Sequence, residues 1–289
     1  MCSDITKEGG NTMKYKMVCL DMDGTLLTDD KKITERSHET LRKVQQKGVK
    51  VVVCTGRLFT SANCYADLLG VKTAVITSNG AYIREKDKNK VVYESILDIE
   101  KCRIFVNIAK KYEACIYFNT TDCIVSDTSE RYVGFYQKYN KTLSPDKQIN
   151  IDIIKDWNEI FDKYRGRFVK CIIADENSKK LDIMRKEISS VLSVEIVSSG
   201  RDNIEIMNKG VSKGRGALIL GDYYGIPRDD IICIGDNEND VSMIDAAGLG
   251  IAMENGDEKA KAAADYITDT NNNDGVAKAL EKFILGTLK

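Results

Sequence analysis

The apolar run at residues 17–20 (MVCL) ends abruptly in Asp21, Met22, Asp23 and Gly24. Four uncharged residues in a row are typical of a strand that is buried on both faces of a parallel sheet. Asp21 would then lie at the carboxyl end of the strand, the edge at which open α/β sheets bind ligands. A strand followed by an ordinary Asp-Gly turn would leave the same pattern, so the segment acquires meaning only with the rest of the chain.

The same pattern returns twice further along the chain. Residues 49–54 (VKVVVC) form a mostly β-branched run that stops at the Thr-Gly-Arg of 55–57, and residues 74–78 stop at the Ser-Asn-Gly of 78–80. Helical segments separate the runs, the first over residues 34–47. Strands that alternate with helices in this way predict a right-handed, doubly wound (Rossmann-like) parallel sheet.

The rhythm changes between residues 82 and 207, where strand pairs alternate with single helices. Residues 82–85 and 91–94 flank a polar segment and predict a hairpin. Further strands are expected at 114–119, 123–126, 168–174, 194–197 and 204–207, and helices near 98–112, 129–139, Trp157 and 178–192, with a polar connection through Pro145. This pattern indicates a mixed α/β domain inserted into the first one.

From Gly210 the first rhythm resumes. Strands are expected at 231–234, 248–253 and 266–268, and helices from Ser212, at 257–264 and at 275–285. We therefore predict an α/β core formed by residues 1–84 and 207–289, with a mobile tail at 1–14, and an inserted α/β cap formed by residues 85–206.

Composition excludes several classes of partner. Of the 289 residues, 43% are hydrophobic and 30% charged, as in a soluble globular protein. The 43 basic and 44 acidic side chains give a net charge of -1, so no overall field would attract nucleic acid or an anionic membrane. No run approaches the ~20 apolar residues of a membrane span, and the first residues lack the apolar centre of a signal peptide.

The cysteines and the single histidine narrow the chemistry. Nine cysteines are an odd number without a CxxC pair, and Cys19, Cys54, Cys171 and Cys233 lie in apolar runs, where a reduced thiol packs as a small hydrophobe. This usage favours a reducing, cytoplasmic setting. His38, expected on the polar side of a surface helix, is the only histidine, which excludes multi-histidine metal sites.

Strand ends that are distant in sequence meet at one edge of a doubly wound sheet. The residues expected in that crevice are Asp21, Asp23, Thr55, Lys213 and the loop 235–240 (GDNEND). Several carboxylates in one crevice repel one another and need a hard cation, and Mg²⁺ suits a few carboxylates combined with water and phosphate oxygens. We expect Asp21, Asp236 and Asp23 as its ligands, Asp23 through its side chain or only its carbonyl oxygen.

Alternatives remain for each of these segments. GDNEND would also suit a solvated acidic loop that caps the next helix, whereas Val241 excludes a helix-loop-helix calcium site, which needs glycine there. Lys213 would be an ordinary helix lysine if it stood elsewhere, but beside the crevice it offers a point charge for a phosphate. Thr55 and Gly56 offer a hydroxyl and a backbone N–H to an anion, or form a mere helix cap.

Together these segments resemble a known family. Asp-Met-Asp-Gly-Thr at 21–25, Thr-Gly-Arg at 55–57, Lys213 and Gly-Asp-Asn-Glu-Asn-Asp at 235–240 are similar, in order, to the four motifs of the haloacid dehalogenase-like superfamily. The large insert, the Ser-Asn-Gly-Ala run at 78–81 and Met243 are similar to its Cof-type, class IIB phosphatases.

The resemblance implies roles for individual residues. Asp21 would attack phosphorus and form an aspartyl-phosphate, while Asp23 would protonate the leaving alkoxide and then activate water. The phosphate would be bound by the backbone N–H of Met22 and by Thr55, Gly56, Lys213 and Asn239. Asp240 would orient Lys213 or bind the metal through water.

The leading hypothesis is thus a Mg²⁺-dependent phosphatase acting on small phosphorylated metabolites such as sugar phosphates. A phosphomutase with a similar core is the enzymatic alternative, and a non-catalytic phosphate-binding regulatory protein the alternative from another class. The insert is expected to exclude water and select the leaving group. Arg165, Arg167 and Tyr136 are candidates for contact with substrate there, although surface solvation is the better explanation for each of them.

Overall fold

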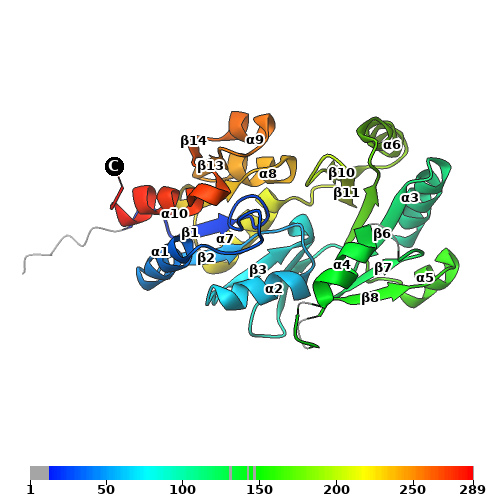
Figure 1. Ribbon diagram of the computed structural model, residues 1–289, viewed down its shortest axis with the longest axis horizontal. Coiled ribbons are helices and arrows are strands. Elements are labelled where there is room, and N and C mark those ends of the chain that lie inside the picture. Colours follow the sequence, from blue (N-terminus) through cyan, green and yellow to red (C-terminus); the bar gives the residue numbers. More distant parts are fainter. Residues whose placement is uncertain (1–12, 130–131, 142, 146–147, 289) are drawn as a thin grey trace, which may run out of the picture.

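The computed structural model describes residues 13–129, 132–141, 143–145 and 148–288, and Figure 1 shows them as two α/β units side by side. In the core unit five strands form a wholly parallel sheet in the order β14-β13-β12-β1-β2. These are β1 (Met17–Leu20), β2 (Lys50–Val53), β12 (Ile231–Gly235), β13 (Leu249–Met253) and β14 (Tyr266–Thr268). The predicted parallel α/β core is confirmed.

Helices cover both faces of this sheet, as the apolar pattern of β1 requires. Val18 and Leu20 pack in one buried cluster, and Met17 and Cys19 pack in another on the opposite face. The first cluster includes side chains of α1 (Glu35–Gln46), α2 (Phe59–Leu68) and α10 (Gly275–Leu280), which a π-helical turn, Glu281–Leu285, extends. The second includes side chains of α7 (Lys213–Tyr224) and α8 (Glu238–Ala246), while α9 (Glu258–Ala263) packs beside α8 and β13.

The predicted third strand, β3 (Ala74–Thr77), joins the parallel sheet through a single bridge between Cys54 and Ile76. A one-turn helix, η1 (Ser78–Gly80), follows it, and β3 then pairs with the predicted hairpin of β4 (Tyr82–Glu85) and β5 (Val91–Glu94). Ile83 packs in the same cluster as Met17. The division predicted after residue 84 therefore passes through β4, and we propose that the insert begins after β5.

The cap unit is built on a six-stranded sheet in the order β10-β11-β9-β6-β7-β8. Its strands are β6 (Cys115–Asn119), β7 (Cys123–Ser126), β8 (Asn150–Ile153), β9 (Lys170–Ala174), β10 (Val194–Val197) and β11 (Asn203–Asn208). All neighbours are antiparallel except β7 and β8. β8 was not predicted, because its four residues (NIDI) carry an aspartate and follow a long polar connection. The division predicted after residue 206 passes through β11.

Side chains alternate between the two faces of the cap sheet, as in any strand. Ile116 and Phe118 of β6 pack in a large apolar cluster with α3 (Ile99–Lys111), α5 (Trp157–Lys163) and α6 (Ser178–Val191). Tyr117 packs instead in a smaller cluster on the opposite face, beneath α4 (Tyr132–Asn140). One face is thus fully covered by helices, whereas the other is only partly covered and is turned toward the core.

The chain crosses between the units twice, before α3 and after β11. Asn208 at the end of β11 ties the crossings together, because its Nδ2 donates to Ser95 Oγ at 3.1 Å and to the Ile96 carbonyl oxygen at 2.7 Å. The insert therefore enters and leaves the core at one place.

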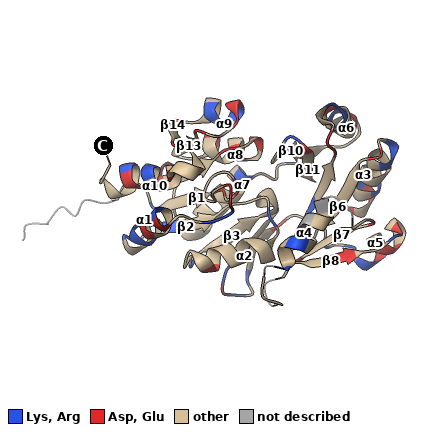
Figure 2. Cartoon of the chain, viewed as in Figure 1, with Lys and Arg blue, Asp and Glu red and all other residues tan. Residues whose placement is uncertain are grey.

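The remaining predictions concern composition. The four cysteines expected in apolar runs, Cys19, Cys54, Cys171 and Cys233, are buried thiols that form no disulfide, and His38 is exposed on α1. Figure 2 shows basic and acidic residues mixed along helices such as α1, α3 and α5. Among the described residues no helix has the length and apolar character needed to cross a bilayer. Apart from its last two residues, the predicted tail at 1–14 lies outside the described residues.

Candidate active site

Asp21 directly follows β1 at the carboxyl edge of the core sheet. Its backbone N–H donates to the Ile234 carbonyl oxygen at 3.0 Å, which continues the pairing of β1 with β12. Its Oδ1 accepts from Lys213 Nζ at 2.6 Å, and the same ammonium donates to Asp240 Oδ1 at 2.6 Å. Lys213, the first residue of α7, is completely buried. The structure thus brings one lysine and two carboxylates, each from a different segment, to one point.

Asp236 lies beside this group at the end of β12. Oxygens of Asp21, Asp236 and Asp240 lie within 4.8 Å of one another. Asp236 Oδ1 accepts from Thr25 Oγ1 at 2.7 Å, and the approach is possible because Gly24 has no side chain: a Cβ there would lie 2.4 Å from Asp236 Oδ2. The predicted carboxylate cluster therefore forms, with the Asp-Gly-Thr turn packed directly on it.

The electrostatics of this cluster favour the binding of a cation. Burial first, and then the nearby Asp240 charge, raise the pKa of Asp21 to about 7 and the pKa of Asp236 to about 8. Burial alone would lower the pKa of Lys213, but the Asp21 and Asp240 carboxylates raise it. Three buried carboxylates with one buried ammonium leave an excess of negative charge, and an all-oxygen donor set suits a hard divalent ion.

Asp240 is the least available of the three carboxylates for such an ion. Its Oδ1 accepts from Lys213, and its Oδ2 accepts from the backbone N–H groups of Asp236 and Asn237 at 2.9 and 3.0 Å, forming a capping box at the start of α8. These contacts fit the implied role of orienting Lys213. They leave Asp21 and Asp236 as the carboxylates best placed to bind the ion.

The Asp23 side chain lies apart from this cluster. Arg57 holds it with two hydrogen bonds, from Nε to Oδ2 and from Nη2 to Oδ1, both 2.7 Å, and Lys31 Nζ adds a contact of 2.8 Å. Burial alone would raise the pKa of Asp23, but Arg57 and then Lys31 lower it well below its ordinary value. The guanidinium itself lies 4.9 Å from the centre of the Tyr65 ring. In this arrangement Asp23 is a carboxylate.

The predicted phosphate-binding residues lie at the same edge. Thr55 Oγ1 accepts from the Arg57 backbone N–H at 3.2 Å. Thr55 is not a helix cap, because α2 begins only at Phe59 with Leu58 in the cap position. The Met22 side chain is completely buried in the core, so that only its backbone remains for a ligand.

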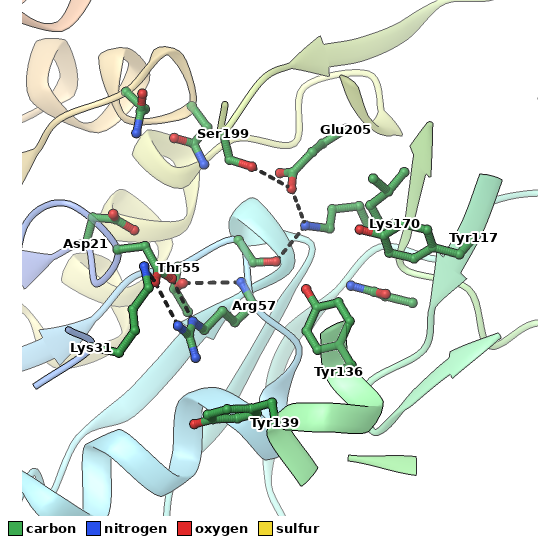
Figure 3. A pocket seen from close by; sticks show the side chains of 16 residues that line it. Asp21, Lys31, Thr55, Arg57, Tyr117, Tyr136, Tyr139, Lys170, Ser199 and Glu205 are labelled. Carbon is green, nitrogen blue, oxygen red and sulfur yellow. Dashed lines mark hydrogen bonds and ion pairs between the residues drawn. The ribbon is translucent and has the colours of Figure 1, made fainter. Parts of the chain in front are cut away.

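These residues open into a cavity of about 270 Å³ between the core and the cap. Its core side is lined by Asp21, Asp23, Lys31, Thr55, Gly56, Arg57, Asn237 and Asn239, and its cap side by Tyr117, Asn119, Tyr136, Tyr139, Lys170, Ile172, Ser199 and Glu205. Figure 3 shows Tyr117, Tyr136 and Lys170 across the cavity from Asp21 and Lys31. Lys213, Asp236 and Asp240 lie behind Asp21.

Of the three candidate cap contacts, only Tyr136 lines this cavity. Arg165 and Arg167 are exposed and lie near carboxylates of their own unit, 3.6 Å from Asp162 and 3.5 Å from Asp122. Surface solvation accounts for these two arginines.

Sequence reasoning gave no role to several residues of the cavity. Arg57 was part of a motif, but its pairing with Asp23 depends on how two loops meet. Lys170 and Glu205 left a signal, since each is a lone charge within an apolar strand (FVKCIIA and NIEIMN). Both residues are almost fully buried, and Lys170 Nζ lies 3.0 Å from Glu205 Oε1. Asn119 left no such signal.

Comparison with known proteins gives consistent matches. The model of the family described as haloacid dehalogenase-like hydrolase matches residues 18–280. A curated relative, 5-amino-6-(5-phospho-D-ribitylamino)uracil phosphatase YitU of Bacillus subtilis, is 29% identical over 276 residues, covering 93% of this chain and 98% of that protein.

Solved structures agree with this match. A haloacid dehalogenase-like hydrolase from Bacteroides thetaiotaomicron is similar with a TM-score of 0.79 and 31% identity, covering 93% of this chain and 99% of that one. Another from B. subtilis is similar with a TM-score of 0.83 and 25% identity, covering 93% of this chain and 100% of that one. At this coverage the similarity includes the insert as well as the core.

Proposed function

Since this chain belongs to the haloacid dehalogenase-like hydrolases, we propose that it is a Mg²⁺-dependent phosphatase that hydrolyses small phosphorylated metabolites through an aspartyl-phosphate. The observation that carries the proposal is the placement of Asp21, whose carboxylate is bound by Lys213 at 2.6 Å and lines the cavity. A buried carboxylate beside an ammonium, at the mouth of a cavity lined by further donors, suits attack on a phosphate group.

The first half-reaction uses Asp21 as nucleophile. One of its carboxylate oxygens attacks phosphorus in line, the bond from phosphorus to the ester oxygen breaks, and the leaving alkoxide takes a proton from Asp23. Thr55, Asn239 and the backbone N–H groups of Met22 and Gly56 would bind the phosphate oxygens. Positioned donors of this kind supply most of the rate in phosphoryl transfer.

The second half-reaction hydrolyses the aspartyl-phosphate. Asp23, now ionised, takes a proton from a water molecule that attacks phosphorus, and inorganic phosphate leaves with Asp21 restored. The pairing of Asp23 with Arg57 and Lys31 favours this ionised state. Delivery of a proton in the first half requires the Asp23 carboxyl to leave Arg57, so binding of the substrate must compete with that ion pair.

The cation would be held by the Asp21 and Asp236 carboxylates, with the Asp23 carbonyl oxygen as the third protein ligand. Bound Mg²⁺ would neutralise charge on the transferring phosphoryl group. Lys213 holds the Asp21 carboxylate in place, because its ammonium donates one hydrogen bond to Asp21 Oδ1 and one to Asp240 Oδ1. The free buried thiols of the chain are in keeping with a reducing compartment, and we place the enzyme in the cytoplasm.

A phosphatase screen tests the proposal. Purified protein is incubated with sugar, sugar-alcohol, nucleotide and cofactor phosphates, with Mg²⁺ and with a chelator, and inorganic phosphate is measured. We expect release that requires the cation and is abolished in Asp21→Asn. Isomerised sugar phosphate without release would instead identify the phosphomutase, and binding of phosphate without turnover would identify the regulatory protein.

A further inference from the structure

One face of the cap sheet forms the wall of the cavity opposite Asp21. Strand alternation places Tyr117 and Asn119 of β6 and Lys170 and Ile172 of β9 on this face, and all four line the cavity. Register fixes their order, because Asn119 pairs with Lys170 and Tyr117 pairs with Ile172. The wall is therefore rigid sheet and not loop, which favours precise recognition of whatever lies against it.

The charged groups of this wall already have partners. Lys170 Nζ donates to the Gly56 carbonyl oxygen at 2.6 Å and to Glu205 Oε1 at 3.0 Å. Glu205 also accepts from Ser199 Oγ at 3.1 Å and, through its other oxygen, from Asn79 Nδ2. Gly56 permits this approach, since a Cβ there would lie 2.9 Å from Asn79 Oδ1. The ion pair thus joins cap to core.

Asn119 differs from its neighbours. Its residue is 4% exposed, and its Oδ1 has no hydrogen-bond partner among the described residues. The backbone carbonyl oxygen of Asn119 accepts from the Val169 N–H at 2.9 Å, so of its two oxygens only the side-chain Oδ1 is without a donor among the described residues. A buried acceptor without a donor costs free energy comparable to a lost hydrogen bond, and such groups in native proteins call for an explanation.

We propose that Asn119 is a specificity-determining residue, and that its Oδ1 accepts a hydrogen bond from a hydroxyl of the leaving group. The inference rests on the proposed phosphatase function and assigns one cap residue that selects, among its substrates, phosphate esters whose leaving group carries a further hydroxyl. Lys170 supports this class, because the contacts above use only two of its three N–H donors, leaving one for a hydroxyl oxygen. The apolar surfaces of Tyr117 and Ile172 flank the pair.

The test compares two kinds of substrate on one variant. Asn119→Leu keeps the volume of the side chain and removes the acceptor. For glycerol 3-phosphate, ribitol 5-phosphate and sorbitol 6-phosphate we expect kcat/KM to fall about tenfold or more, mainly through KM, as loss of one hydrogen bond predicts. For phenyl phosphate, whose leaving group carries no other hydroxyl, we expect a change of less than about twofold.

Asn63 supplies a matched control. Its Oδ1 also has no partner among the described residues, but it lies on α2 outside this cavity. Asn63→Leu should leave kcat/KM unchanged for the polyol phosphates and for phenyl phosphate. Asn119→Leu should also unfold at an unchanged or higher temperature, because it removes a buried acceptor without breaking a bond. A second variant, Asn119→Asp, keeps an acceptor and should keep the preference for polyol phosphates over phenyl phosphate.

The outcomes separate the two proposals. If Asn119→Leu lowers kcat/KM equally for polyol phosphates and phenyl phosphate, or lowers it for neither, the role of Asn119 is overturned. Wild-type protein that cleaves phenyl phosphate at least as well as every polyol phosphate overturns the substrate class and leaves the phosphatase standing. Wild-type protein that releases phosphate from no ester overturns the proposed function, and this inference with it.

Discussion

The core sheet and the cap sheet use their strands in opposite ways. In the five-stranded core sheet all strands are parallel and both faces are covered by helices, so that the polar side chains of the site lie at strand ends, as at Asp21 and Asp236. In the cap most strands are antiparallel and one face is only partly covered. There five of the eight residues that line the cavity lie within strands, namely Tyr117, Asn119, Lys170, Ile172 and Glu205.

The difference indicates where we expect residues that act on every substrate and where we expect residues that distinguish between substrates. A strand end is a local feature, with a turn and polar residues that follow an apolar run. A sheet face is assembled from single side chains of several strands. We therefore expect changes at the core edge to affect every substrate, and changes on the cap face to affect substrates unequally or to affect the joint between the units.

The largest effect is expected at Asp21. Asp21→Asn removes the proposed nucleophile and should lower phosphate release on the order of 10⁴-fold or more for every substrate, with the fold retained by circular dichroism. Asp222→Asn, an exposed change on α7, is the matched control and should keep full activity. Near-native turnover in Asp21→Asn would falsify the assignment of the nucleophile.

Arg57 comes next, because it sets the protonation of Asp23. Its contacts lower the pKa of Asp23, so Arg57→Gln should raise that pKa and keep the carboxyl protonated to higher pH. Since the proposed hydrolytic half-reaction needs ionised Asp23, the acidic limb of the kcat profile should move upward by about 1–3 pH units. Lys31→Gln removes a contact to Asp23 that is more exposed to solvent, so it should move the acidic limb by a smaller amount. An unshifted limb in Arg57→Gln would separate Asp23 from the proton transfers.

Loss of the contact that joins the cap to the core should lower the free energy of unfolding. Lys170→Met leaves Glu205 as a buried carboxylate without its ammonium and should destabilise the protein by about 3 kcal/mol in urea unfolding. Lys179→Met, an exposed change on α6, should be nearly neutral. If Lys170→Met were equally neutral, the contact between β9 and the Gly56 loop would be too weak to hold the cap.

The smallest effect concerns the cation and pH. The folded pKa values of Asp21 and Asp236, about 7 and 8, lie above the ordinary value of 3.8. The metal-free fold therefore binds protons that the unfolded chain releases, and it should lose stability as pH rises from about 4 to 8. In the proposed site Mg²⁺ would bind the ionised carboxylates, so 10 mM Mg²⁺ should raise the unfolding temperature by about 5 °C at pH 8 and by less at pH 5.5.

Asp236→Asn provides the comparison for that measurement. It removes one ligand and one repulsive charge, so it should unfold at a higher temperature than wild type without metal and respond little to Mg²⁺. A Mg²⁺ response of wild-type size in Asp236→Asn would place the cation elsewhere.

The strands of the core could be predicted from the sequence more completely than the strands of the cap. Each core strand lies within about a residue or two of its predicted position, because a buried parallel strand is a continuous apolar run that stops at small or polar residues. The same rule located Asp21 and Asp236. In the cap, β8 was not predicted because its sequence, NIDI, is short and half polar. The hairpin of β4 and β5 was predicted, but in the structure it pairs with β3 and so extends the edge of the core.

The two sides of the cavity differ for the same reason. Thr55, Lys213 and Asp240 follow from spacing along the chain, since each belongs to a local segment with a recognisable composition. The pairing of Arg57 with Asp23, by contrast, depends on two loops meeting. Asn119 depends on alternation within β6 and on which face α4 leaves open, and neither can be derived from composition or periodicity of the segment alone.

The bond from Asn208 to the first crossing has a consequence for how such a chain can vary. Because residues 95 and 208 lie side by side, the insert between them can be exchanged as a cassette without stretching the core, and a short loop would close the gap at little entropic cost. Grafting a foreign cassette at this junction would give one set of reacting groups a new leaving-group pocket in a single recombination event. The junction thus separates the inheritance of reactivity from the inheritance of selectivity.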